Sequence, residues 1–409
     1  MIDSDVSSTR LKWVLVGVLI VSMGVLIGIG IVPALSEGDR AMRDLKGFYA
    51  AGECLLQGDN PYDAETFAGK YRELTGREPA GRFNYPPVLG PFCMALAGVP
   101  FAWARVLIIF LNIVGTMAIS FVALRMCMAG GHFATRSIAV TAGVICASFV
   151  LIFPGTARLI EVGQVSLFAG GLALLAWWLG AREREVDRTR QVLAGIALGM
   201  ATIKPQFAII PFTWLFLEER WRSLATAMAV AAILAAPMAL IVGPLEVVRD
   251  WLGLVGGAGA IGGFYVVMGL PSLLASFELP VPNVWMLILA SVPLTIVVWL
   301  ARNRLVESDL LGILFGAQFA LLYGKYVELG LLAPMLGGLL LYGSWSAGRW
   351  VMILLGTASL FAPPFLFLQL KMPSINHFKT LVVLYGLFLL VNWSIGQAAL
   401  MRHAVHTGQ

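Results

Sequence analysis

The chain has few charged side chains, and this scarcity excludes most soluble proteins. Asp, Glu, Lys and Arg make up 12% of its 409 residues, whereas hydrophobic residues make up 59%. A soluble protein carries about twice that charged fraction. Apolar runs long enough for membrane helices recur to the C-terminus. We therefore expect an all-α polytopic membrane protein rather than a soluble enzyme.

Cysteine and histidine are also scarce, with four of each. The cysteines have no paired spacing and predict no disulfide framework, and the scattered histidines predict no zinc site. Residues 257–262 match G-x-G-x-x-G, but no strand precedes them, so a dinucleotide site is excluded. We expect no metal and no cofactor. The net charge of +5 does not indicate nucleic acid, because the basic residues cluster between apolar runs, as membrane orientation requires.

Twelve apolar stretches are candidates for membrane crossing. They are 12–35, 102–126, 137–153, 162–180, 191–203, 205–217, 222–243, 283–301, 308–324, 326–343, 350–369 and 378–400. The first is too long for the core of a signal peptide, so we expect a retained anchor. The pattern predicts one domain over residues 1–409, a bundle of about 12–13 transmembrane helices in the cell (inner or plasma) membrane.

Arginines set the expected orientation. Arg182, Arg184, Arg188 and Arg190 form a short basic loop that should be cytoplasmic. Counting crossings from it places both termini in the cytoplasm and residues 37–84 outside, with a second external loop at 244–282. This parity requires residues 86–100 to enter the membrane and return without crossing.

The long polar segment 37–84 is the main candidate for chemistry. Its first part has apolar residues at spacings of three and four, which predicts a helix on the membrane surface that Gly58 ends. These residues are Met42, Leu45, Phe48, Tyr49, Gly52, Leu55 and Leu56. Asp44 lies at the edge of this stripe. It either points into a partly desolvated pocket or simply pairs with Arg40 one turn away.

A second unusual feature is the pair of short stretches 191–203 and 205–217, joined at Lys204-Pro205. Broken helices at membrane depth are tolerated only where they line a cavity or are buried in protein. A charge at that depth costs roughly 2.5–3.5 kcal/mol on insertion scales, so it tends to be functional. Lys204 therefore either serves a site or extends to the lipid headgroups.

Several short motifs follow one another along the chain. In order, they are Asp44-Leu45-Lys46-Gly47-Phe48-Tyr49-Ala50-Ala51-Gly52, Gly58-Asp59-Asn60-Pro61-Tyr62, Phe83-Asn84-Tyr85-Pro86-Pro87, Gly163-Gln164-Val165-Ser166, and Ala194-Gly195 through Ile203-Lys204-Pro205. With its N-terminal anchor, the chain resembles the GT-C class of membrane glycosyltransferases, and most closely glycosyltransferase family 87. That family comprises polyprenyl-phosphate-sugar-dependent mannosyltransferases and their relatives.

The resemblance implies an inverting enzyme on the extracytoplasmic side of the membrane. Its partners would be membrane lipids, a polyprenyl-phosphate-linked sugar donor, commonly of mannose, and a glycolipid or glycan acceptor. Asp44 would be the general base. The leaving phosphate needs cations, and the candidates are Lys204, Lys325 and Arg43. Where family members often have a histidine in a late helix, this chain has Lys325 before Tyr326 and Glu328.

The remaining candidates are substrate-binding residues with simpler alternatives. They are Tyr85, Gln164, Tyr326, Glu328 and His377. Tyr85 and His377 could be interfacial residues, and Gln164 a helix-packing hydrogen bond. Tyr326 and Glu328 could serve only to bond or neutralise Lys325, and Arg43 could contact solvated headgroups.

Two other functions stay open on the sequence alone. One is a multi-pass transporter or flippase of a lipid-linked or small polar substrate, since buried lysines and broken helices also mark transport pathways. A transporter usually has two related halves, and no clear internal repeat is visible. The other is a polymerase or ligase of lipid-linked glycans, which we would expect to carry its largest external loop late in the chain.

Overall fold

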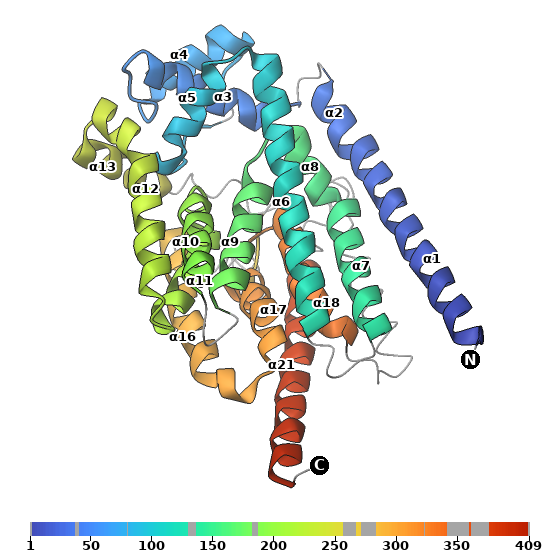
Figure 1. Cartoon of the computed structure of the whole chain (residues 1–409). Coiled ribbons are helices and arrows are strands. Elements are labelled where there is room, and N and C mark those ends of the chain that lie inside the picture. Colours follow the sequence, from blue (N-terminus) through green and yellow to red (C-terminus); the bar gives the residue numbers. More distant parts are fainter. Residues whose placement is uncertain are drawn as a thin grey trace.

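The computed structural model describes residues 2–36, 41–79, 81–129, 136–181, 187–256, 267–270, 284–322, 324–341, 360 and 376–407. The described chain is almost entirely helical, apart from one antiparallel pair of two-residue strands. Both termini lie at one end of the helical bundle (Figure 1). The opposite end, called here the loop end, carries α3 (Arg43–Leu56), α4 (Ala64–Thr75) and α5 (Gly90–Ala97). The expected all-α polytopic membrane fold is confirmed.

The other elements follow the chain from one end of the bundle to the other. The N-terminal half adds α1 (Ile2–Leu26), η1 (Ile27–Ile31), α2 (Val32–Leu35), η2 (Pro87–Leu89), α6 (Phe101–Ala129), α7 (Arg136–Ile152), α8 (Pro154–Val162), α9 (Ser166–Gly180) and α10 (Arg188–Ala201). The C-terminal half adds α11 (Pro205–Leu217), α12 (Trp221–Val242), α13 (Pro244–Gly256), β1 (Val267–Met268), α15 (Val284–Leu289), α16 (Ser291–Ala301), η5 (Arg302–Arg304), α17 (Glu307–Ala317), η6 (Gln318–Leu322), β2 (Gly324–Lys325), η7 (Tyr326–Leu332), α18 (Ala333–Leu341) and α21 (Asn376–Thr407).

Within the described residues, five helical stretches are long and apolar enough to cross a membrane. They are Lys12–Leu35, Phe101–Ala129, Trp221–Val242, Met286–Arg304 and Lys379–Arg402. A sixth forms if α7 and α8, bent by 44° at their junction, count as one span. This is fewer full-length spans than expected, because α9 and α11 are shorter than a span. The crossing expected over 350–369 lies, apart from residue 360, outside the described residues.

The segment 86–100 stays at the loop end, in agreement with the expected topology. It forms η2 and the eight-residue α5, and α5 lies beside α3 and α4 (Figure 1). Eight residues of helix extend only about 12 Å, too little to cross the hydrocarbon core. Gly52 of α3 allows this packing, because a Cβ there would collide with the backbone carbonyl of Cys93 in α5.

The helix predicted near residues 42–56 is α3. Leu45 and Phe48 are buried, and Gly58 follows the helix with a positive φ of 83°, which a glycine adopts without strain. The next helix, α4, is capped by Asp63, whose side chain accepts a hydrogen bond from the Thr66 N–H at 2.8 Å. That bond lowers the pKa of the Asp63 carboxyl. Both helices pack on one another and position the loop above the bundle.

Candidate functional site

The start of α3 is fixed to the end of α8. Met42, the residue before the helix, has a φ of 55° and donates its backbone N–H to the Glu161 carbonyl oxygen at 2.7 Å. Few non-glycine residues adopt this conformation, so the surrounding contacts must maintain it. Asp44 lies in the first turn of α3, where a carboxylate interacts favourably with the helix dipole. Its backbone is therefore anchored to the bundle.

The turn between α8 and α9 lies directly against this first turn of α3. Gly163 has a φ of 70°, and a Cβ on it would lie 2.8 Å from the Leu45 Cβ. Only glycine allows both the conformation and the close approach. The next residue, Gln164, is buried and reaches Asp44 although the two are 120 positions apart in sequence.

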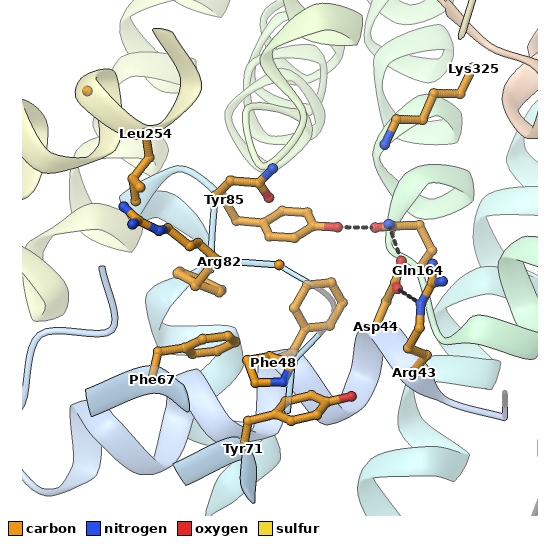
Figure 2. Close-up of a pocket in the computed structure, with 16 residues that line it drawn as sticks. Arg43, Asp44, Phe48, Phe67, Tyr71, Arg82, Tyr85, Gln164, Leu254 and Lys325 are labelled. Carbon is orange, nitrogen blue, oxygen red and sulfur yellow. Dashed lines mark hydrogen bonds and ion pairs between the residues drawn. The ribbon is translucent and has the colours of Figure 1, made fainter. Parts of the chain in front are cut away.

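Gln164 links Asp44 to Tyr85 through hydrogen bonds (Figure 2). The Gln164 Nε2 donates to the Asp44 Oδ2 at 2.6 Å. Its Oε1 accepts from the Tyr85 hydroxyl at 2.8 Å and from the Val165 N–H at 3.0 Å. Burial raises the pKa of the Tyr85 hydroxyl well above its ordinary value, so the phenol keeps its proton and donates. Two donors on Oε1 fix the amide orientation, and Asp44 is then the acceptor.

These residues form one wall of a cavity of about 640 Å³ at the loop end. Aromatic rings on α3, α4 and the following segment form much of the remaining wall. They belong to Phe48, Phe67, Tyr71 and Phe83. Apolar walls with a few convergent polar groups are typical of small-molecule sites. Asp44, with 19% of its side chain exposed, is thus partly desolvated and still open to a ligand.

Three cationic side chains also line the cavity. Arg43 Nε lies 3.1 Å from Asp44 Oδ1, and about half of the Arg43 side chain is exposed. Lys325 extends toward the cavity from β2, on the side away from Tyr71 (Figure 2). Arg82 lies beside Leu254 at the far end of the cavity from Asp44. Sequence reasoning missed Arg82, although it immediately precedes the aromatic motif that begins at Phe83.

Lys204 lies behind Tyr85 and not on the wall that the described residues outline. Its Nζ is 5.2 Å from the centroid of the Tyr85 ring and 3.9 Å from the Glu328 Oε1. Glu328 is buried and also accepts from the Ser166 hydroxyl at 2.8 Å. The expected convergence of polar groups at this end of the bundle is thus present in two layers, one on the cavity and one inside the protein.

The second external loop contributes to the same cavity through α13. Gly253 and Leu254 line it, and the Asp250 Oδ2 accepts a hydrogen bond from the Asn60 Nδ2 at 2.9 Å. This bond joins the two external loops. Sequence reasoning gave no role to Asp250 or to Asn60, because nothing in either local pattern marks a contact 190 positions away.

Other predicted features lie outside the described residues. Arg40 and residues 257–262 are among these, as are the side chains of Tyr326 and His377. The pairing of Asp44 that the structure does describe is with Arg43. Within the described part of the chain, no group of three or more His, Cys, Asp or Glu could hold a metal ion.

Comparison with known proteins places this geometry in a family. A search of curated proteins finds no match. The sequence profile of glycosyltransferase family 87 matches residues 83–324, more than half of the chain. That segment includes Tyr85, Gln164 and Lys204, whereas Asp44 precedes it and Lys325 follows it. The chain belongs to glycosyltransferase family 87.

Proposed function

We propose that the protein is an inverting glycosyltransferase that takes a sugar from a polyprenyl-phosphate donor. The acceptor is a hydroxyl of a lipid-linked or free glycan, and mannose is the first sugar to test. Family membership supports the glycosyl transfer. The observation that carries the mechanism is the position of Asp44, a partly buried carboxylate on a cavity that also contains Arg43 and Lys325.

The proposed reaction is a single displacement with Asp44 as general base. The acceptor oxygen bonds to the anomeric carbon, and its proton passes to the Asp44 carboxylate. The bond from that carbon to the phosphate oxygen breaks, and the polyprenyl phosphate leaves with the electron pair. Lys325 and Arg43 are the cations proposed to stabilise the charge on the leaving phosphate. The aromatic rings around Phe48 would exclude water and contact the apolar faces of the sugars.

The proposed location is the cell (inner or plasma) membrane, with the cavity on the extracytoplasmic side. Arg188 and Arg190 begin α10 at the end of the bundle where the termini lie, opposite the cavity. Arg302 and Arg304 form η5 at the same end. Arginines between membrane helices favour the cytoplasmic side, so the loop end would face outward.

Purified protein incubated with radiolabelled polyprenyl-phosphate sugars and glycolipid or glycan acceptors tests this function. We expect transfer from at least one donor, with inversion at the anomeric carbon, and no transfer by the Asp44→Asn variant. Transfer by that variant at the wild-type rate would refute Asp44 as the base. Absence of transfer with every donor, together with movement of a lipid-linked sugar across proteoliposomes, would favour the flippase alternative.

A further inference from the structure

Lys204 is the buried charge nearest to the cavity that does not line it. It lies between α10 and α11, at the N-cap position of α11, and only 7% of its side chain is exposed. The ring of Tyr85, which does line the cavity, lies against its amino group. A ligand in the cavity would therefore meet Tyr85 before it met Lys204.

Glu328 explains the presence of a cation at this depth. Its side chain is 1% exposed, and its Oε1 lies 3.9 Å from the Lys204 Nζ. The same carboxylate accepts from the Ser166 hydroxyl and, at 3.4 Å, from the Lys325 N–H. A buried charge without a counter-ion is strongly destabilising, and removing one partner costs more than removing both. Lys204 and Glu328 are thus placed to neutralise one another.

Tyr85 connects this internal pair to the carboxylate on the cavity. One face of its environment is the Lys204 amino group, and Phe48 packs edge-on against its ring at 4.8 Å between centroids. Its hydroxyl donates to Gln164, which in turn donates to Asp44. A cation near an aromatic ring is attracted to it, so moving Lys204 would release one constraint on Tyr85.

We propose that Lys204 is a positioning residue for glycosyl transfer and not a ligand of the donor phosphate. It serves as the counter-ion of Glu328 and holds the Tyr85 ring, while Tyr85 and Gln164 hold Asp44 in place. The same pair fixes the start of η7, because Glu328 accepts from the Lys325 N–H. This role rests on the proposed function, since it acts on the base of that reaction.

The test compares Lys204→Met with Lys325→Met in the transfer assay, using one radiolabelled polyprenyl-phosphate sugar as donor. A positioning lysine should lower kcat by about tenfold or more while the donor KM stays within about twofold. Lys325→Met, which removes a cation from the cavity itself, should raise the donor KM. The double variant Lys204→Met/Glu328→Gln should recover kcat to within about threefold of wild type, because no buried charge is left unpaired.

Two results would overturn the proposal. One is a rise in donor KM for Lys204→Met that matches that of Lys325→Met. The other is a double variant no more active than Lys204→Met alone. Should Lys204→Met not fold, Tyr85→Leu serves in its place, because it removes the ring and keeps the ion pair. That variant should lower kcat at an unchanged donor KM, and an unchanged kcat would count against the role of Tyr85.

A failure of the proposed function can be told apart from a failure of the pairing. If the wild-type protein transfers no sugar from any donor, the proposed function fails, and the positioning role fails with it. The ion pair is then judged by the Tm values of wild type, both single variants and the double variant in detergent. Additive losses across this set would show that Lys204 and Glu328 do not interact.

Discussion

Two acidic residues near the cavity have opposite surroundings. Asp44 lies on the cavity wall, keeps 19% of its side chain exposed, and is held by Arg43 and Gln164. Glu328 is enclosed, with 1% exposed, and is held by Lys204 and Ser166. Both have a cation and a neutral donor, so the set of partners does not separate them. Access to a ligand does, and it assigns chemistry to Asp44 and internal neutralisation to Glu328.

The largest expected difference is between Asp44→Asn and Glu328→Gln. Losing a general base should lower kcat by about 10²–10⁴-fold, with little change in Tm. Losing Glu328 leaves Lys204 buried without its counter-ion and should cost on the order of 3 kcal/mol of stability. Transfer kinetics and thermal unfolding in detergent measure the two effects. Equal losses of Tm in both variants would remove the distinction drawn here.

The next prediction concerns the cations. Lys325→Met should lower kcat/KM by roughly 10²-fold, because one contact to a developing charge is worth a few kcal/mol in a low-dielectric site. Arg72→Met is the matched control, since Arg72 lies on α4 at the same end of the protein and pairs with Glu78 on the surface. Steady-state kinetics with varied donor measure both. A similar loss in the control would indicate general attraction of anionic substrates.

A smaller effect should separate the two bonds of Gln164. Gln164→Leu removes the donor to the Asp44 carboxylate, and bonds to charged groups are worth about 1.5–3 kcal/mol, so kcat should fall by roughly 10–100-fold. Tyr85→Phe should cost only about 2–10-fold, because the Val165 N–H still fixes the Gln164 oxygen. Single-turnover rates measure the difference. The reverse order would mean that Tyr85 contacts the substrate itself.

The smallest effect concerns the contact between the external loops. Asn60→Ala removes the bond to Asp250 and should lower Tm by about 2 °C, as expected for a loss near 1 kcal/mol. Asn392→Ala is the control, because that side chain bonds only within α21, to the Phe388 carbonyl. Differential scanning fluorimetry in detergent compares them. A larger loss in the control would show that the Asn60 bond adds nothing to stability.

The sequence predicted the parts of this protein that depend on local pattern. Apolar spacing located α3, the Lys204-Pro205 junction located the break between α10 and α11, and short length kept residues 86–100 at one end. Those predictions rest on periodicity, helix breakers and membrane thickness, all of which act within one turn or one span.

Contacts between distant segments could not be read from the same pattern. Nothing near Gln164 shows that it donates to Asp44, and nothing near Lys204 identifies Glu328 as its partner. For Lys204, burial and charge were visible, but the side of Tyr85 on which it lies was not. That choice depends on how α11 and η7 pack, which is a property of the whole bundle.

The short strand pair links the cavity to the second external loop. Lys325 is paired with Val267, and Gly324 with Met268, so the backbone that carries this lysine is joined to a segment beyond α13. The location of the cation is therefore inherited from a distant stretch of chain and is not an intrinsic property of β2. Sequence changes in residues 244–282 would retune charge placement next to the sugar without altering any side chain that touches it.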